Sequence, residues 1–252
     1  MTIVTAFFDI HRDTKGDGRT LDEYMSWIQK TLQLNCNLYV VTESKFVPFM
    51  KANRNYPMYI HEDTLENASY YKYLPRMKEI LESDAYKKRI AYPNRVECIL
   101  PEYNIIQYSK FGWLEEAMLI NPFQSDTFFW MDAGISRFFG EVDLTLPYPR
   151  SIHTDQFIIQ PREDLWHYPI DDSIVWKADN LFKGGMFGGK AEIVSVLRKK
   201  VEEVFQFMLS QQNVNNEQIA ITLVWKKYPD LFHLVSTKKS PCDVVLYLSN
   251  TP

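Results

Sequence analysis

One carboxylate, Asp132, ends a strongly apolar run and is the first candidate for chemistry. The run, residues 128–131 (FFWM), contains no charged side chain, which is typical of a strand buried on both faces. The next two residues, Ala133 and Gly134, are small enough for a ligand to approach the backbone. Because ligands gather at the carboxyl ends of strands in open α/β sheets, Asp132 suits contact with a metal ion or a ribose. Capping of the following turn is an equally good interpretation from position alone.

A glycine-rich segment, residues 182–190 (FKGGMFGGK), is the second candidate. Paired glycines let a ligand come close to the backbone, so the segment fits a binding loop. It has neither of the glycine spacings that mark phosphate-binding loops, G-x-x-x-x-G-K-[ST] and G-x-G-x-x-G. A simple turn before the next helix is the alternative.

A second carboxylate, Glu217, lies in the first turn of a helix predicted to begin near Asn215. Asn215 and Gln218 have the spacing of a capping box, so Glu217 fits the positive end of that helix. The functional interpretation makes Glu217 a pocket carboxylate. It would bond an acceptor hydroxyl or stabilise developing positive charge.

Three cations lie near the ends of predicted elements. Lys110 is on the helix before the Asp132 strand, and Arg12 and Arg137 each follow a strand by a few residues. Cations at such positions suit neutralisation of a diphosphate, although a lysine in mid-helix usually faces solvent. His233 is the histidine that a late strand could return towards Asp132. The sequence contains neither HExxH nor G-x-S-x-G, so zincin and serine-hydrolase chemistry are poorly supported.

Alternating strand and helix patterns place these residues in an α/β protein. The first half has β-branched or apolar strand patterns at residues 2–10, 37–42 and near 59, separated by helical patterns at 20–32, 64–92 and 104–120. Thr20 and Glu23 have capping-box spacing at the start of the first helix. We expect a strand at 153–161, helices after 190 and from 215, and late strands at 231–235 and 243–248. This alternation predicts a mostly parallel sheet with helices on both faces.

Length and composition fit an ordinary globular protein. The chain has 252 residues and a net charge of −4, so no broad basic surface for nucleic acid is expected. Three scattered cysteines form no CxxC pair and favour a reducing, cytoplasmic location. We expect no signal peptide and no membrane span, because no apolar run approaches about 20 residues.

Five segments, in order along the chain, resemble the HtrL/YibB family: TIVTAFFDIHR, SKFGWLEEAMLINPF, FFWMDAGISRF, GGMFGG and NNEQIAITLVWKKYPDLF. That family is linked to bacterial polysaccharide loci. The layout is also similar to that of GT-A glycosyltransferases, which use a nucleotide-sugar donor, a Rossmann-like sheet and an Asp-x-Asp motif at a strand end. The resemblance implies a single GT-A-like domain over residues 1–252, with a nucleotide-sugar-binding half (1–135) and an acceptor-binding half (136–252).

The resemblance also implies roles for individual residues. The donor would be bound by the end of the first strand, the cations and the residues around Asp132, namely Thr5, Ala6, Phe7, Arg12, Lys110, Asp132, Ala133, Gly134 and Arg137. Gly188, Gly189 and Gln218 would contact the acceptor. Glu217 matches the late acidic residue that faces the reaction centre, and Asp155 is a second candidate for the catalytic base.

The sequence departs from the GT-A pattern at Gly134, which replaces the second Asp of Asp-x-Asp. A divalent cation such as Mn²⁺ is still expected, held by Asp132 with His233 or Asp155. Otherwise, Lys110, Arg12 and Arg137 would take over its electrostatic role.

These observations predict a glycosyltransferase that moves a hexosyl or pentosyl group from a nucleoside-diphosphate sugar, UDP-linked, to a glycan hydroxyl. The alternatives are a non-catalytic saccharide-binding protein and a nucleotidyltransferase. The missing second Asp favours the former. The latter normally carries a glycine- and lysine-rich signature after the first strand, of which this chain has only scattered pieces.

Overall fold

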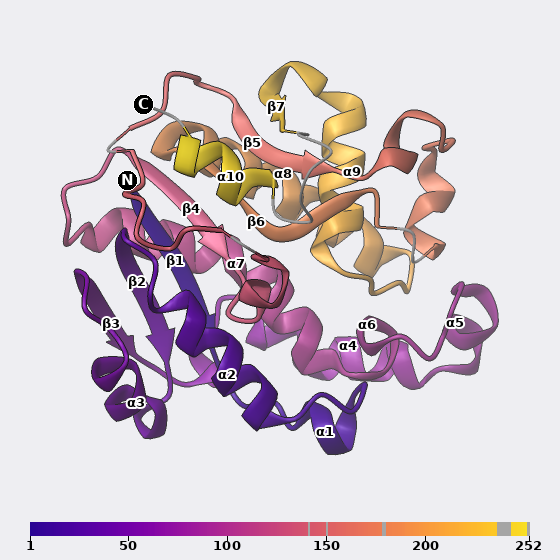
Figure 1. The fold of residues 1–252 in the computed structure, drawn as a ribbon. Coiled ribbons are helices and arrows are strands. Elements are labelled where there is room, and N and C mark those ends of the chain that lie inside the picture. The colour runs from indigo at the N-terminus through magenta and orange to yellow at the C-terminus, as the bar shows by residue number, and fades with distance from the viewer. Residues whose placement is uncertain (141, 150, 178–179, 236–242, 251–252) are drawn as a thin grey trace.

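The molecule is built around a seven-stranded sheet with the strand order β3-β2-β1-β4-β6-β5-β7 (Figure 1). The computed structural model describes residues 1–140, 142–149, 151–177, 180–235 and 243–250. The strands are β1 (Thr2–Phe7), β2 (Asn37–Thr42), β3 (Met58–Glu62), β4 (Thr127–Met131), β5 (Phe157–Pro161), β6 (Phe182–Lys190) and β7 (Phe232–Leu234). β6 runs antiparallel to β4 and β5, whereas the other neighbouring pairs are parallel. The predicted α/β class and mostly parallel sheet are confirmed.

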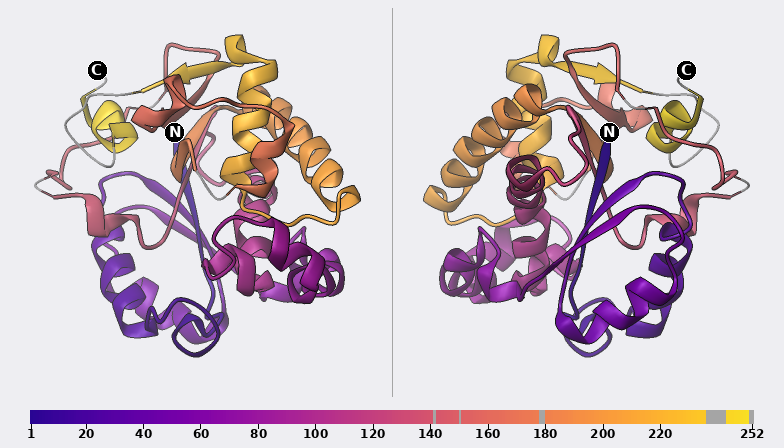
Figure 2. Two further views of the ribbon diagram at one scale, coloured as in Figure 1. Left: turned by 90° about the vertical axis from the view of Figure 1, so that its right-hand side faces the viewer. Right: turned by 90° about the vertical axis from the view of Figure 1, so that its left-hand side faces the viewer.

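Helices cover both faces of the sheet, as predicted (Figure 2). One face packs against α2 (Leu21–Thr31), α3 (Val47–Ala52) and α10 (Asp243–Asn250). The other packs against α4 (Leu74–Glu82), α5 (Asp84–Arg89), α7 (Pro101–Ile120), α8 (Ala191–Ser210) and α9 (Glu217–Lys227). Two short helices, α1 (Arg12–Lys15) and α6 (Val96–Ile99), complete the set named in Figure 1. Of the described helices, none is long and apolar enough to cross a membrane.

Strand β4 is buried on both sides, which explains its apolar sequence. Phe128 and Trp130 face the α7 side, while Phe129 and Met131 face the α2 side, because successive side chains in a strand point to opposite faces. Asp132 is the first residue beyond this strand. The apolar run therefore delivers one carboxylate to the carboxyl edge of the sheet.

Local capping confirms the predicted start of α2 and sets the start of α9 one residue later than predicted. At α2, the Thr20 side chain accepts a hydrogen bond from the Glu23 amide, and the Glu23 carboxylate accepts one from the Thr20 amide at 2.8 Å. At α9, the cap is Asn216 rather than the predicted Asn215. Its side-chain oxygen accepts hydrogen bonds from the backbone amides of Gln218 and Ile219. Glu217 is consequently the first residue inside α9.

The glycine-rich segment is strand β6, so its prediction as a loop was wrong. A Cβ atom on Gly188 would lie 2.2 Å from the Phe128 carbonyl oxygen and 2.6 Å from the Phe129 Cα atom. A glycine inside a strand often marks such a close backbone approach. The paired glycines thus report tight contact between β4 and β6, not a flexible turn.

The predicted strand at 243–248 was also wrong, because these residues form helix α10. Val244, Val245 and Leu248 are buried against the α2 side of the sheet. Their spacing is helical, but a short apolar run does not distinguish a buried strand from a buried helix. The predicted strands at 153–161 and 231–235 are confirmed as β5 and β7, each shorter than predicted.

Candidate active site

The strand order creates a crevice between β1 and β4. The chain leaves β1 towards β2 on one side and later returns to pair β4 on the other side, so the connections diverge at the carboxyl ends of these two strands. Such switch points are where open α/β sheets bind ligands. A cavity of about 680 Å³ opens there. Its walls come from the end of β1, the loop before α2, the start of α7, the end of β4 and the start of β6.

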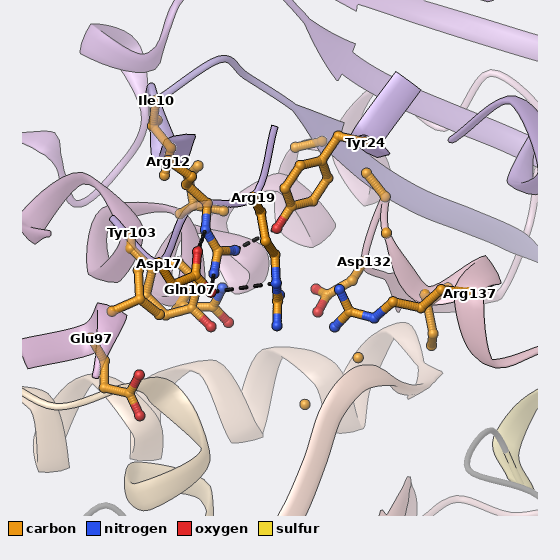
Figure 3. Close-up of a pocket in the computed structure, with 18 of the residues that line it drawn as sticks. Ile10, Arg12, Asp17, Arg19, Tyr24, Glu97, Tyr103, Gln107, Asp132 and Arg137 are labelled. Carbon is orange, nitrogen blue, oxygen red and sulfur yellow. Dashed lines mark hydrogen bonds and ion pairs between the residues drawn. The ribbon is translucent and has the colours of Figure 1, made fainter. Parts of the chain in front are cut away.

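Asp132 presents one carboxylate oxygen to this cavity (Figure 3). Its Oδ1 atom accepts a hydrogen bond from the Trp130 indole nitrogen at 2.6 Å and lies 2.9 Å from the Lys110 ammonium. Its backbone amide donates to the Gly185 carbonyl at 2.8 Å. Oδ2 has no bonding partner among the described residues, and the side chain is 37% exposed. One oxygen therefore fixes the group, and the other is available to a ligand.

Lys110 is completely buried beneath the cavity, in the middle of α7. Its ammonium donates to Glu217 Oε1 at 2.7 Å and to the Gly184 carbonyl at 3.0 Å, besides contacting Asp132. These three acceptors use all three of its protons. Burial opposes the charge of Lys110, but the two carboxylates outweigh it and raise the pKa of its ammonium above the usual value. Lys110 is therefore a permanent cation that joins α7, β4, β6 and α9.

Glu217 is the third member of this buried cluster and is fully shielded from solvent. Burial raises the pKa of Glu217 to about 7, although the charge of Lys110 limits the rise. Its Oε2 atom is buried and has no hydrogen-bond partner among the described residues. A Cβ atom on Gly184 would lie 2.4 Å from Glu217 Oε1, so glycine at 184 is required for this packing. Glu217 thus titrates near neutral pH behind the cavity wall.

Arginines gather on the cavity wall near Asp132 (Figure 3). Arg12 binds the Asp17 carboxylate through two nitrogens, at 3.0 and 2.6 Å, and also donates to the Tyr24 hydroxyl. Arg19 approaches the same carboxylate at 3.4 Å. The Asp17 carboxylate therefore contacts the guanidinium groups of both Arg12 and Arg19 and orients them towards the cavity.

Arg137 lies across from these two and has a different environment. It belongs to the 3₁₀ turn Ile135–Phe138 after Asp132 and stacks on Trp27 and Phe138, with its guanidinium carbon 4.9 and 4.6 Å from the ring centres. It forms no ion pair within the described part of the chain. Partial burial lowers the pKa of Arg137, and the nearby Arg19 charge lowers it further. This crowding of positive charge favours an anionic ligand.

A model of a bacterial protein family of unknown function, HtrL_YibB, matches residues 1–243. The chain belongs to the HtrL/YibB family. Among solved structures, the crystal structure of mouse xyloside xylosyltransferase 1 in its apo form is similar, with a TM-score of 0.43 and 14% sequence identity. The match covers 93% of this chain and 84% of that chain. No curated protein matches this chain in sequence.

Several predicted site residues of this HtrL/YibB protein do line the cavity, on the walls that the strand ends provide. They are Ala6, Phe7, Arg12, Asp132, Ala133, Gly134, Arg137 and Gln218. Three others are buried away from it. Thr5 lies inside β1, and Lys110 and Glu217 lie behind the wall, all with no exposed surface. The prediction that Lys110 contacts the donor phosphates directly is therefore wrong, because all three ammonium protons already bind groups within the protein.

Four further predictions are corrected by position. Gly188 and Gly189 do not line the cavity, because they pack in the sheet against β4 and against Ile193 and the backbone before β5. Asp155 precedes β5, which runs parallel to β4, so it lies at the opposite edge of the sheet from Asp132. It is 89% exposed and pairs with Lys190 at 2.6 Å.

His233 is also distant from Asp132. It lies on β7, separated from β4 by β6 and β5, and three strand spacings amount to about 14 Å. Its ring packs against Tyr247 instead, with the ring centres 5.6 Å apart. The two residues predicted to share a metal ion are therefore not brought together.

The residues around Asp132 do not fit a preformed divalent-metal site. A Cβ atom on Gly134 would lie 3.0 Å from Trp27 and 3.1 Å from Tyr24, so a second carboxylate has no room there without movement. Among the described residues, no group of three or more His, Cys, Asp or Glu could hold a metal ion. Manganese and magnesium prefer several oxygen ligands, and Asp132 offers one free oxygen beside the Lys110 charge.

Sequence reasoning missed much of the polar cavity wall, including Asp17, Arg19, Tyr24, Glu97, Tyr103 and Gln107. One signal was available in α7. Tyr103, Gln107 and Lys110 are spaced i, i+4, i+7 and therefore share a helix face. This spacing groups three polar side chains on one face of α7, which indicates a face that meets either solvent or a site rather than the apolar core.

Proposed function

We propose that this protein is a glycosyltransferase that binds a nucleoside-diphosphate sugar, with uridine as the nucleoside. It transfers the hexosyl or pentosyl group to a hydroxyl of a saccharide or glycan. The proposal rests on one observation above all: a carboxylate, Asp132, shares a switch-point cavity with five arginines, and near it the charges of Arg12, Arg19 and Arg137 are only partly neutralised. The resemblance of the sequence to GT-A enzymes supports the same assignment.

The arginines suit the diphosphate of the donor. Arg12 and Arg19 are held by Asp17, and Arg137 is held by aromatic stacking, so all three are oriented before a ligand arrives. Guanidinium groups bind phosphate oxygens in pairs and remain charged at every physiological pH. Negative charge develops on the diphosphate as the bond to the sugar breaks. Fixed cations stabilise that charge without reorganisation.

Asp132 is the carboxylate that meets the reacting sugar in this proposal. Its free Oδ2 atom faces the cavity, while Trp130 and Lys110 hold Oδ1. Glu217 acts through Lys110 and is a positioning residue, because it reaches no cavity surface. This replaces the predicted direct role of Glu217 in catalysis.

The charge-neutralising role falls to the arginines in this proposal, not to Mn²⁺. The surroundings of Gly134 and the position of His233 both support that assignment. Asp132 Oδ2 is the oxygen that would contact a metal ion entering with the donor phosphates.

Thermal stability with nucleotides tests the proposal directly. We expect UDP to raise the unfolding midpoint equally with Mn²⁺ and with EDTA, since a ligand at about 100 times its dissociation constant adds about 2.7 kcal/mol. Arg137→Gln should weaken UDP binding, and the exposed control Lys78→Gln should not. Slow hydrolysis of a UDP-sugar should appear with the wild-type protein and be lost in Asp132→Asn.

Other outcomes would identify the alternatives. Stabilisation by free saccharides but not by any nucleotide would replace the enzyme with a saccharide-binding protein. Turnover of a nucleoside triphosphate with a sugar phosphate would indicate a nucleotidyltransferase. Stabilisation by UDP only in the presence of Mn²⁺ would overturn the arginine assignment and restore a metal bound to Asp132.

A further inference from the structure

Three polar side chains on one wall of the cavity have unused hydrogen-bonding capacity. Glu97 is 5% exposed, and its carboxylate accepts one long hydrogen bond, 3.3 Å, from the Asn216 side chain. Gln107 is 6% exposed, and its side-chain amide has no hydrogen-bond partner among the described residues. The side-chain oxygen of Gln218 is buried and likewise lacks a partner there. All three residues line the cavity.

Buried polar groups are normally satisfied, and the buried Gln218 oxygen is an exception that calls for an explanation. Gln107 and Glu97 lie on the same cavity wall with hydrogen-bonding capacity that no described residue uses. A ligand that supplies the missing partners does explain them.

The fold holds this wall next to Asp132. Gln107 lies one turn before Lys110 on the same face of α7, and Lys110 contacts Asp132. Gln218 follows Glu217 in α9, and its Cγ atom would lie 2.8 Å from a Cβ placed on Gly184. Figure 3 shows Glu97 and Gln107 on the Tyr103 side of the cavity, with Asp132 and Arg137 across from them. A ligand that reaches from Arg137 past Asp132 would meet this wall.

The arginines near Asp132 and the wall formed by Glu97, Gln107 and Gln218 differ in chemistry. Arginine only donates hydrogen bonds, which suits phosphate oxygens. An amide both donates and accepts, and a carboxylate accepts, which together match hydroxyl groups that do both. We propose that Glu97, Gln107 and Gln218 form a subsite for saccharide hydroxyls, named here the hydroxyl subsite. The inference rests on the proposed function, and the hydroxyls come from the donor sugar or the acceptor sugar.

The test uses Gln107→Met and Gln218→Met, which keep side-chain length but remove the amide. Gln211→Met, at the exposed end of α8, is the matched control. Calorimetry gives the dissociation constants of UDP and of UDP-glucose, UDP-galactose, UDP-xylose and UDP-N-acetylglucosamine. The sugar increment is the ratio of the UDP constant to the UDP-sugar constant. Transfer assays with a panel of saccharide acceptors give the acceptor KM, and free saccharides are titrated separately.

We expect at least one UDP-sugar to bind more tightly than UDP. If the donor sugar occupies the hydroxyl subsite, Gln107→Met reduces the sugar increment about tenfold, or about 1.4 kcal/mol, and leaves UDP binding within twofold. If the acceptor occupies it, the sugar increment is unchanged and the acceptor KM rises by a similar factor. Either result supports the subsite, and the control variant should match the wild type in both.

Different results would refute the proposed function and the hydroxyl subsite. Failure of the wild-type protein to bind UDP would refute the nucleotide-sugar assignment. The subsite would survive if a free saccharide then bound in a manner lost in Gln107→Met. Wild-type values in both variants, or an equal loss of affinity for UDP itself, would overturn the hydroxyl subsite.

Discussion

Replacing Glu217 with Gln should remove a pH dependence from the stability of this protein. Glu217 is fully buried beside Lys110, and burial raises its pKa from 4.5 to about 7. Because the folded-state pKa is the higher one, folding favours the protonated acid. The stability linked to this group is fully present below about pH 4.5 and is lost as the pH rises through about 7.

The magnitude follows from the two pKa values. A difference of about 2.5 at about 1.4 kcal/mol each corresponds to roughly 3 kcal/mol between the two ends of this window. Most of it, about 2–3 kcal/mol, falls between pH 5 and pH 8. This is a large fraction of the roughly 5–15 kcal/mol that stabilises a typical domain.

Urea unfolding of the wild-type protein and Glu217→Gln at pH 5, 6, 7 and 8 measures the effect. The quantity to follow is the wild-type free energy of unfolding minus that of the variant, because shared titrations cancel. We expect this difference to fall by about 2–3 kcal/mol as the pH rises from 5 to 8. An exposed glutamate of α8 gives a control, Glu192→Gln, in which no buried acid is removed. A flat difference for Glu217→Gln would refute the assignment of a titrating buried acid.

Three further outcomes follow from the same geometry. Lys110→Met should lower the free energy of unfolding by about 3–5 kcal/mol in urea, because two carboxylates lose their shared cation. Adding Glu217→Gln should restore part of this loss, and additive losses would contradict the coupling. Gly134→Asp should lower the melting temperature and leave UDP binding independent of Mn²⁺, because the added Cβ atom would lie 3.0 Å from Trp27. Tight, Mn²⁺-dependent UDP binding by this variant would show that the site can accept a metal. Gly188→Ala should lower the melting temperature more than Gly189→Ala does. The added methyl group at 188 would lie 2.2 Å from the Phe128 backbone, whereas that at 189 would lie 2.7 Å from the Ile193 side chain. Equal melting temperatures would argue against tight β4–β6 packing.

Local patterns were sufficient to predict the frame of the site. The apolar run before Asp132 predicted a strand buried on both faces, and the Thr20–Glu23 spacing predicted the start of α2. Both signals depend on neighbours within a few residues, where side-chain period and capping chemistry are decided. Asp132 could therefore be placed at a strand end from the sequence.

The burial of Lys110 could not be predicted in the same way. Its partners are 22, 74 and 107 residues away along the chain, at Asp132, Gly184 and Glu217. The spacing of Tyr103, Gln107 and Lys110 places this lysine on a polar helix face, but it does not tell whether that face meets solvent or a buried site. The role of Gly188 was hidden for the same reason, because the backbone that it must approach belongs to another strand.

The distribution of charge around Asp132 gives a physical reason for glycine at 134. Six cationic side chains line the cavity, against five carboxylates: Arg12, Arg19, Arg95, Arg137, Arg162 and Lys183 against Asp9, Asp13, Asp17, Glu97 and Asp132. Positive charge therefore exceeds negative charge on the cavity wall before any ligand binds. A diphosphate would balance that excess at the point where the arginines face the cavity. A second aspartate at 134 would reduce the excess that attracts the diphosphate, and its Cβ would lie 3.0 Å from Trp27 and 3.1 Å from Tyr24, so both rings would have to shift. In the proposed function, the missing acidic residue and the arginine cluster are therefore two parts of one electrostatic arrangement for binding the donor diphosphate through guanidinium groups.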